Sequence, residues 1–430
     1  MAQSQQKVFN RWLVVVGAIL IQLCLGAIYA WSVFTPYLTG KLIDPVSTFA
    51  FSKTQTQVVF SVGLAAFAFV MVFAGRWQAK VGPRKVAITG GILLGLGYIL
   101  GGLLGQSFIT QVIFIGLIGG AGIGFAYVCP ISVGMKWFPD KKGLITGLAV
   151  AGFGFGALIW MKLADNWGHL LENFGVLRVF LIYGIVFAVA VLIGSIWMKN
   201  PPEGWKPAGW NPTEQKKGKK SASVGDIKPS QMLRSPQFYG LWVMFIFSGM
   251  SGLMTIGIIK LFGIDALQQR GGFDATQASI IAGTAMAVFY SLANGIGRIV
   301  WGTVSDKIGR KLSLFIMCLT QGIMMLIFYA MGSNQYLLYL GATIIGFNFG
   351  GNFALFPTAT ADFFGTKNVG MNYPFVFTAY GIGGIIGPVM AGIIGGKGSW
   401  LPAFIVCGVA CIIAALIGIT LKPPKSADAK

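Results

Sequence analysis

The sequence predicts an all-α membrane protein with twelve transmembrane helices in two six-helix bundles. Three observations lead to this fold class. The 430 residues are 55% hydrophobic and only 10% charged, with a mean hydropathy of +0.74, which excludes a soluble chain of this length. The apolar residues fall into twelve long stretches, and a polar segment separates the first six from the last six. Lipid is therefore the main solvent of this chain.

Each stretch is long enough to cross the hydrocarbon core, which needs about 20 apolar residues. The first stretch follows Lys7 and Arg11, is too long for the core of a signal peptide and lacks a small-residue cleavage site, so we expect it to stay attached. The twelve spans are expected at 12–39, 55–75, 86–106, 110–135, 143–162, 175–198, 236–260, 277–302, 312–332, 336–358, 371–395 and 399–421.

A cytoplasmic linker is predicted at 199–235, between an N-terminal bundle at 1–198 and a C-terminal bundle at 236–430 that ends in a short cytoplasmic tail. The linker carries Pro201, Pro202, Pro207 and Pro212 and four lysines around Gly218, and it has almost no apolar run. A segment of this composition buries too little apolar surface to fold alone.

The positive charge predicts the orientation of the chain. The formal net charge is +20, and the Lys and Arg residues of alternate loops number 24 on one side and 7 on the other. Cytoplasmic loops are enriched in Lys and Arg, so we expect a multi-pass protein of the cell (inner) membrane with both termini in the cytoplasm. Because the charge is spread over loops, it favours lipid headgroups over nucleic acid as its partner.

The two halves repeat each other at an offset of 227 residues. Glycine and proline positions match, which predicts two parallel six-span units with a substrate path between them. The glycine-rich runs Gly152–Gly156 and Gly381–Gly387 resemble phosphate-binding turns, but no strand precedes them, and close helix packing is the favoured interpretation. The matched pairs are Gly75 with Gly302, Gly82 with Gly309, Gly119 with Gly346, Gly124 with Gly351, Pro130 with Pro357, Gly154 with Gly381, and Gly156 with Gly383.

Two of these matched loops carry a recognisable motif. The string GTVSDKIGRK, Gly302 to Lys311, resembles the loop motif of the major facilitator superfamily, and GRWQAKVGPRK, Gly75 to Lys85, is a degraded copy with Ala79 in place of an acid. The resemblance implies a gating motif at Gly302, Asp306, Gly309 and Arg310. Gly302 is expected to permit close helix approach.

Arg298 is the one basic residue that belongs to neither set of loops, and all twelve acids are expected in loops, the linker, the tail or span ends. An unpaired guanidinium in the bilayer costs from about 3 to more than 10 kcal/mol, so an anionic substrate is the favoured counter-ion. Helical spacing places Arg298 on one face with Thr284, Ser291 and Asn294, and Asn294 is expected to orient the guanidinium. The alternative is an arginine that extends to the lipid headgroups.

Aromatic residues of several spans are candidates to line the substrate cavity beside Arg298 and Asn294. For each ring, packing or a position at the membrane interface is the alternative. The candidates are Tyr29, Tyr127, Phe349, Phe353, Phe377 and Tyr380.

The composition excludes other chemistry. All five cysteines lie in apolar stretches and His169 is the single histidine, so we expect no metal site, no disulfide framework and no cofactor. No set of paired acids or Ser and His residues lies in the spans, so no catalytic residue is assigned and an enzyme is not expected.

Several longer strings resemble the oxalate/formate antiporter family, which is related to the monocarboxylate transporters. They are LGAIYAWSVF, WFPDKKGLITG, LRSPQFYGLW, GRIVWGTVSDKIGR and ALFPTATADFFGTKNVGMNYPF. The resemblance implies that Arg298 is one of two cations facing a dianion, and that Tyr380 stands where the oxalate exchanger has the second, a lysine. One cation matches one carboxylate, because a second carboxylate left unpaired would cost several kcal/mol.

We therefore expect a monomeric secondary transporter of small monocarboxylates of the lactate, pyruvate or formate type. Proton coupling is the favoured mode. Asn294 stands where related transporters carry an aspartate, so Asp274 or Asp265 is the candidate for proton uptake, with a solvated span-end role as the alternative for each. The other hypotheses are an oxalate/formate-type exchanger and a carboxylate sensor that does not transport.

Overall fold

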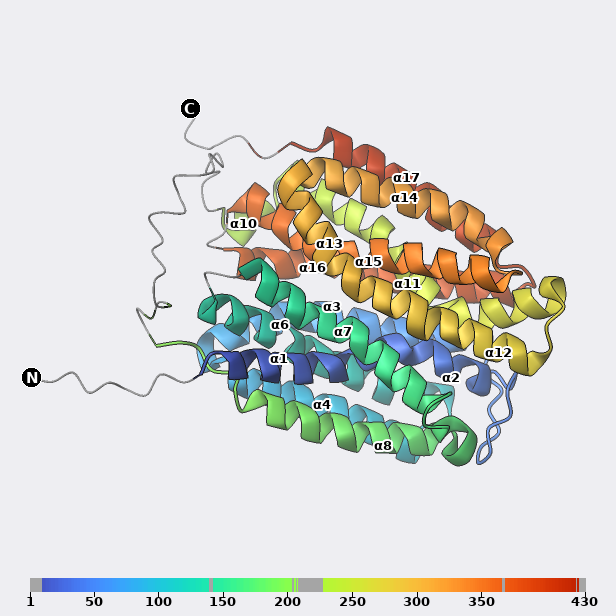
Figure 1. Cartoon of the computed structure of the whole chain (residues 1–430). Helices are drawn as coiled ribbons and strands as arrows, with labels where there is room; N and C mark the ends of the chain where they lie inside the picture. The colour runs from blue at the N-terminus through green and yellow to red at the C-terminus, as the bar shows by residue number, and fades with distance from the viewer. Residues whose placement is uncertain are drawn as a thin grey trace, which may run out of the picture.

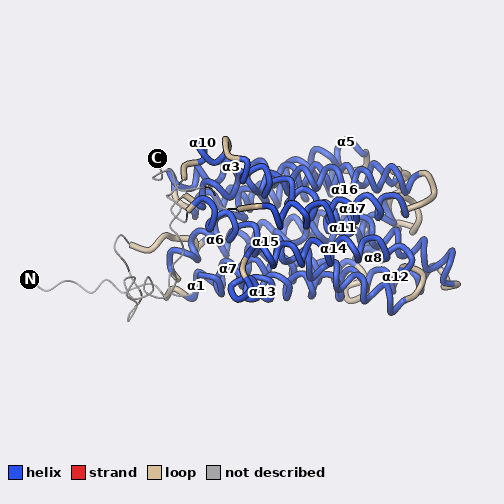
Figure 2. The backbone as a smooth tube through the Cα atoms, turned by 90° about the horizontal axis from the view of Figure 1, so that it is seen from above, coloured by secondary structure: helices blue, strands red, loops and turns tan. Residues whose placement is uncertain are grey.

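The computed structural model describes residues 10–138, 142–202, 205, 207, 227–365, 368–422 and 424. Within those residues the regular structure is helical (Figure 2). The first half contains α1 (Trp12–Leu25), η1 (Gly26–Ala30), α2 (Trp31–Leu38), α3 (Lys53–Val81), α4 (Pro83–Leu104), α5 (Phe108–Gln111), the π-helical η2 (Val112–Gly119), α6 (Gly120–Trp137), α7 (Lys142–Ala164) and α8 (Leu170–Ser195).

The second half contains α10 (Pro229–Met232), α11 (Pro236–Gly271), α12 (Ala275–Thr284), the π-helical η3 (Ala285–Tyr290), α13 (Ser291–Ile308), α14 (Arg310–Met331), α15 (Gln335–Phe364), α16 (Val369–Gly396) and α17 (Leu401–Thr420). Consecutive pieces such as α1–η1–α2 and α12–η3–α13 each form one span.

Length and composition confirm the predicted spans. Eleven of the described helical segments are long and apolar enough to cross a membrane, and the part of α7 from Val150 to Ala164 is a shorter apolar helix. The whole of α7 has 23 residues, which at ~1.5 Å per residue is about 35 Å, enough for the hydrocarbon core.

The helices run side by side along one axis in two bundles (Figure 1). The first six spans, blue to green, lie below the last six, yellow to red. α1 begins and α17 ends at the same end of the molecule, which we name the terminal face; the other end is the opposite face. This arrangement is the predicted two-bundle fold.

The repeat of the two halves is visible in the backbone. Gly82 ends α3 and precedes α4 with φ 87°, and its match Gly309 ends α13 and precedes α14 with φ 90°. Positive φ strongly favours glycine because it has no Cβ. The two matched glycines therefore make the same tight helix-to-helix turn.

Two of the contacts between the bundles are related by the same repeat, α7 with α13 and α16 with α3. A Cβ built on Gly154 would lie 3.2 Å from the Gly295 nitrogen, and one built on Gly381 would lie 2.7 Å from the Ala68 Cβ. Ala68 and Gly295 are themselves 227 positions apart. The glycine-rich runs thus serve close helix packing, as predicted, and Gly154 and Gly381 bring the two bundles close together.

α11 differs from its prediction. The span was expected to end at residue 260, but the helix continues to Gly271 and encloses Lys260 and Asp265. The apolar residues Leu261, Phe262 and Ile264 of this extension are buried. The two charges suggested a loop, but each forms an ion pair with the other bundle. Asp265 pairs with Lys41, and Lys260 pairs with Asp165.

Most of the predicted linker lies outside the described residues. Its last part is held against the C-terminal bundle, because the Ile227 N–H donates to the Phe364 carbonyl at 3.0 Å and Asn372 Nδ2 donates to the Ile227 carbonyl at 3.0 Å. The short helix α10 follows. The domain boundaries themselves stay a prediction.

The gating motif lies at the terminal face, where α13 ends. Arg310 Nε donates to the Asp362 carboxylate at 3.3 Å, and its guanidinium also donates to Ser305 Oγ. The side chain of Asp306 lies outside the described residues. The expectation for Gly302 was wrong, because a Cβ there would meet the Ala354 Cβ at 3.6 Å, an ordinary contact. Space alone does not require glycine at this position.

Two alanine substitutions five positions apart in α13 test this packing. A Cβ at Gly297 would lie 2.1 Å from the Phe347 carbonyl oxygen, so Gly297→Ala should destabilise the protein by about 1–3 kcal/mol through overpacking. Gly302→Ala should be neutral or stabilising by up to about 1 kcal/mol, because alanine is the better helix former. Thermal unfolding in detergent measures both, and equal destabilisation would contradict the packing described.

Candidate functional site

The candidate site is built around Arg298 of α13. Its side chain is 2% exposed, and Nε donates to Asn294 Oδ1 at 3.1 Å, one helical turn earlier. Asn294 is 1% exposed. The hydrogen bond expected from the helical spacing is therefore present, and it fixes the plane of the guanidinium.

The two terminal nitrogens of Arg298 have no hydrogen-bond partner in the described part of the chain. The guanidinium carbon lies 4.0 Å from the ring centre of Phe353 and 5.9 Å from that of Phe153. Each ring lies about three turns from the nearer end of its helix. Arg298 is thus held at mid-depth by cation–π contacts, and it does not extend to the headgroup level.

The aromatic candidates form one cluster with Arg298. Tyr29 of η1 and Tyr380 of α16 belong to different bundles, and their hydroxyls are 2.9 Å apart. Phe353 lies 5.7 Å from Tyr380 and Phe349 lies 5.8 Å from Tyr29. Phe377 stacks on both Tyr380, at 4.7 Å, and Tyr127, at 5.9 Å. All six predicted rings therefore meet at the interface between the bundles.

Phe67 and Phe153 also belong to this cluster and were missed from the sequence. Phe67 lies 5.6 Å from Tyr380, and Phe153 lies 4.8 Å from Tyr29. Both could have been found from the repeat, because Phe153 is 227 positions before Tyr380 and Phe67 is 227 positions before Asn294. Positions matched by the repeat face the same interface from opposite sides.

The polar face predicted on the eighth span is only partly present. Ser291, Asn294 and Arg298 are buried, at 1–2% exposure, whereas Thr284 is half-buried. The π-helical η3 lies between Thr284 and Ser291, and its wider turn shifts the register that a regular α-helix would keep. Thr284 therefore does not continue the stripe.

Asp265 is not the solvated span-end residue that was the alternative for it. It lies inside α11 with 15% of its side chain exposed, and it pairs with Lys41 and with Lys53, the latter at 3.1 Å. Trp400 Nε1 donates to the same carboxylate at 3.0 Å. Because both lysines belong to the N-terminal bundle, this cluster links the two bundles at the opposite face.

Asp274, the other candidate for proton uptake, has a simpler role in the structure. It is exposed, and its carboxylate accepts the Gln277 N–H at 2.8 Å as the N-cap of α12. A capping carboxylate stabilises a helix start without any contact to the substrate path.

The arrangement can bind an anion. Arg298 offers two N–H-bearing nitrogens without protein acceptors, and a guanidinium donates to a carboxylate through two parallel hydrogen bonds. The surrounding rings exclude water, which strengthens such an interaction. Within the described residues no group of His, Cys, Asp and Glu could hold a metal ion.

Comparison with known proteins identifies the family. The family model described as Major Facilitator Superfamily matches residues 12–289 and 261–430. The chain belongs to this superfamily. Its fold matches a crystal structure of the nucleoside transporter NupG, with a TM-score of 0.68 at 13% sequence identity over 95% of this chain and 99% of the other.

Three relatives match over most of the chain. The uncharacterized MFS-type transporter YhjX of Escherichia coli (strain K12) is 34% identical over 87% of this chain and 86% of its own. The oxalate:formate antiporter of Oxalobacter formigenes is 26% identical, with 98% and 94% covered. Apicoplast pyruvate carrier 1 of Toxoplasma gondii is 26% identical, with 86% and 81% covered. This superfamily member is thus a multi-pass membrane protein similar to transporters.

Neutralising Asp265 should open the opposite face. In Asp265→Asn the two lysines lose their shared carboxylate, and a charged hydrogen bond is worth roughly 1.5–3 kcal/mol. Val33 of α2 is 2% exposed. We expect a cysteine introduced there by Val33→Cys to react with a membrane-impermeant maleimide about tenfold faster in the Asp265→Asn protein than in the protein with native Asp265. The five native cysteines are buried.

Asp274→Asn is the matched control, because it removes the same charge from an exposed position near the same face. Equal labelling rates in the two variants would show that Asp265 does not hold the bundles together.

Proposed function

We propose that this chain is a secondary transporter of small monocarboxylates of the lactate, pyruvate or formate type, working by alternating access. The observation that carries the proposal is the buried guanidinium of Arg298, which has two terminal nitrogens without partners and lies between the bundles. A carboxylate satisfies both the charge and the two nitrogens. In this proposal the segments 1–198 and 236–430 rock against each other around that site, joined by the linker 199–235.

The number of cations favours one carboxylate over two. Tyr380 contributes a hydroxyl at the place where the oxalate exchanger family has a lysine, and its oxygen already contacts Tyr29. The rings around Arg298 suit the short apolar tail of a monocarboxylate. A relative named as a pyruvate carrier supports this choice.

An oxalate/formate-type exchanger is the second candidate. It is favoured by the relative named as an oxalate:formate antiporter, which aligns over 98% of this chain. A dianion would leave one carboxylate facing rings and tyrosine hydroxyls without a second cation, at a cost of several kcal/mol.

The terminal face is proposed to be cytoplasmic, in the cell (inner) membrane. The support is the excess of Lys and Arg, 24 to 7, in the loops assigned to that side. The cluster of Asp265 with Lys41 and Lys53 then lies at the extracellular face.

Proton coupling is proposed to act through Asp265 rather than through Asp274. The Asp265 carboxylate joins the two bundles, so its protonation would weaken that link and favour opening. Asp274 caps a helix and touches neither Lys41 nor Lys53 in the described contacts.

The assignment of Arg298 is tested by uptake into liposomes. Wild-type protein should accumulate labelled lactate or pyruvate, and Arg298→Ala should lose at least about 90% of uptake while remaining folded, since the charge-assisted pair is worth more than 1.4 kcal/mol. Arg298→Lys should recover only part, because an ammonium lacks the planar fork. Arg270→Ala, at an exposed arginine over Tyr329, is the control that should retain uptake. Full activity of Arg298→Ala refutes the assignment.

The preference for one carboxylate is tested at position 380. Tyr380→Lys should shift preference from lactate toward oxalate, because it adds a second cation to the ring cluster around Arg298. Tyr380 lies next to Phe353, the ring that contacts the guanidinium. Competition of unlabelled oxalate against labelled lactate gives the measurement, with an expected gain for oxalate of about tenfold or more. Tyr380→Met removes the ring without adding charge and should show no such gain. An unchanged preference in Tyr380→Lys means that this residue does not face the ligand.

A further inference from the structure

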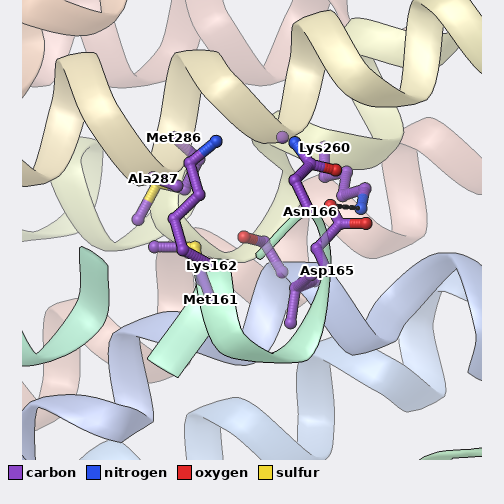
Figure 3. Close-up of a pocket in the computed structure, with 10 residues that line it drawn as sticks. Met161, Lys162, Asp165, Asn166, Lys260, Met286 and Ala287 are labelled. Carbon is purple, nitrogen blue, oxygen red and sulfur yellow. Dashed lines mark hydrogen bonds and ion pairs between the residues drawn. The ribbon is translucent and has the colours of Figure 1, made fainter. Parts of the chain in front are cut away.

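A cavity lies between the bundles toward the opposite face (Figure 3). α2 and the end of α7, with the turn that follows it, form one side, and α11, α12 and η3 form the other. The residues that line it are Ser32, Val33, Met161, Lys162, Asp165, Asn166, Lys260, Gly283, Met286 and Ala287. It is therefore separate from the ring cluster around Arg298.

The charges in this cavity do not balance. Lys260 of α11 has 1% of its side chain exposed and pairs with Asp165, which follows α7, at 2.6 Å. Lys162 is 7% exposed, and its ammonium makes no ion pair or hydrogen bond with the residues that the structure describes. Figure 3 shows its side chain reaching toward Met286 and Ala287, apart from the Asp165–Lys260 pair. The cavity thus holds two cations and one carboxylate, and that carboxylate pairs with Lys260.

A buried hydroxyl in the same cavity also lacks a partner. Ser32 is 1% exposed, and its Oγ makes no hydrogen bond in the described part of the chain. A buried donor without an acceptor costs about 1–3 kcal/mol. An unpaired ammonium and an unpaired hydroxyl in one small cavity are the donors that an anion would satisfy.

We propose that Lys162, Lys260 and Ser32 form an outer carboxylate subsite, which a monocarboxylate occupies on its way to Arg298. The proposal rests on the proposed function. Lys162 follows Phe153 by nine residues on α7, and Phe153 faces Arg298. At ~1.5 Å per residue the two sites are about 14 Å apart along the helix, too far for one small anion to contact both.

The Asp165–Lys260 pair makes this subsite dependent on conformation. Asp165 belongs to the N-terminal bundle and Lys260 to the C-terminal bundle. When the opposite face opens, the two separate and Lys260 loses its counter-ion. An entering carboxylate then replaces Asp165 beside Lys260 and accepts from Lys162 as well. Cations in a narrow, low-dielectric entrance also concentrate anions before they bind.

The test compares transport from the two sides of the membrane with labelled lactate. In right-side-out membrane vesicles, Lys162→Gln should raise the half-saturating lactate concentration about tenfold and leave the maximal rate unchanged. The reason is that the bound carboxylate loses one charge-assisted hydrogen bond. In inside-out vesicles the half-saturating concentration should not change, because the cavity faces the other side. Lys162→Arg should behave as wild type in both. Lys397→Gln, which removes an exposed charge near the same face, is the matched control.

Equal half-saturating lactate concentrations for Lys162→Gln and Lys397→Gln in right-side-out vesicles would overturn the subsite. Loss of transport in both vesicle types, with Lys162→Arg also inactive, would assign Lys162 a structural role and overturn it too. If the wild-type protein takes up no lactate, pyruvate or formate, the proposed function itself fails, and the subsite fails with it. Wild-type uptake thus distinguishes the two failures.

Discussion

A positive charge placed between two bundles, with no carboxylate of the described residues beside it, is the constraint on which the rest of the structure depends. Arg298 is buried, its Nε is held by Asn294, and Phe353 covers one face of its guanidinium. These contacts orient the group without neutralising it. An uncompensated charge at this depth costs from about 3 to more than 10 kcal/mol. Pairing with an anionic ligand would offset that cost, because the described residues supply no counter-ion.

The contacts between the bundles explain how such a site could open to either side. Gly154 against Gly295 and Gly381 against Ala68 bring the backbones close in two matched places, and neither contact involves a charge. The ion pairs that join the bundles in the described residues lie toward the opposite face, at Asp265 and Asp165. Ion pairs thus join the two bundles at the opposite face, and small residues pack them together in two matched places. Rocking of two rigid bundles requires an interface of this kind.

Local sequence signals predicted most of the fold and the central residue of the site. Hydropathy located the spans, and 3.6-residue spacing placed Asn294 beside Arg298, because both depend on neighbours along one helix. The errors came from partners distant in sequence. Asp265 and Lys260 were taken to mark a span end, since Lys41 and Asp165, which neutralise them, lie 224 and 95 positions away. Phe67 and Phe153 needed the internal repeat, because a phenylalanine in an apolar span carries no signal of its own.

The direct test of the central claim is whether charge on the ligand is what the folded protein recognises. Thermal unfolding of the purified protein should be followed with lactate and with lactamide, its neutral amide, over the same concentrations. A ligand that binds only the folded state raises the midpoint as its concentration exceeds Kd. The account predicts that lactate raises the midpoint progressively and that lactamide does not. Equal stabilisation by the two ligands, or none by lactate, pyruvate or formate, would contradict it.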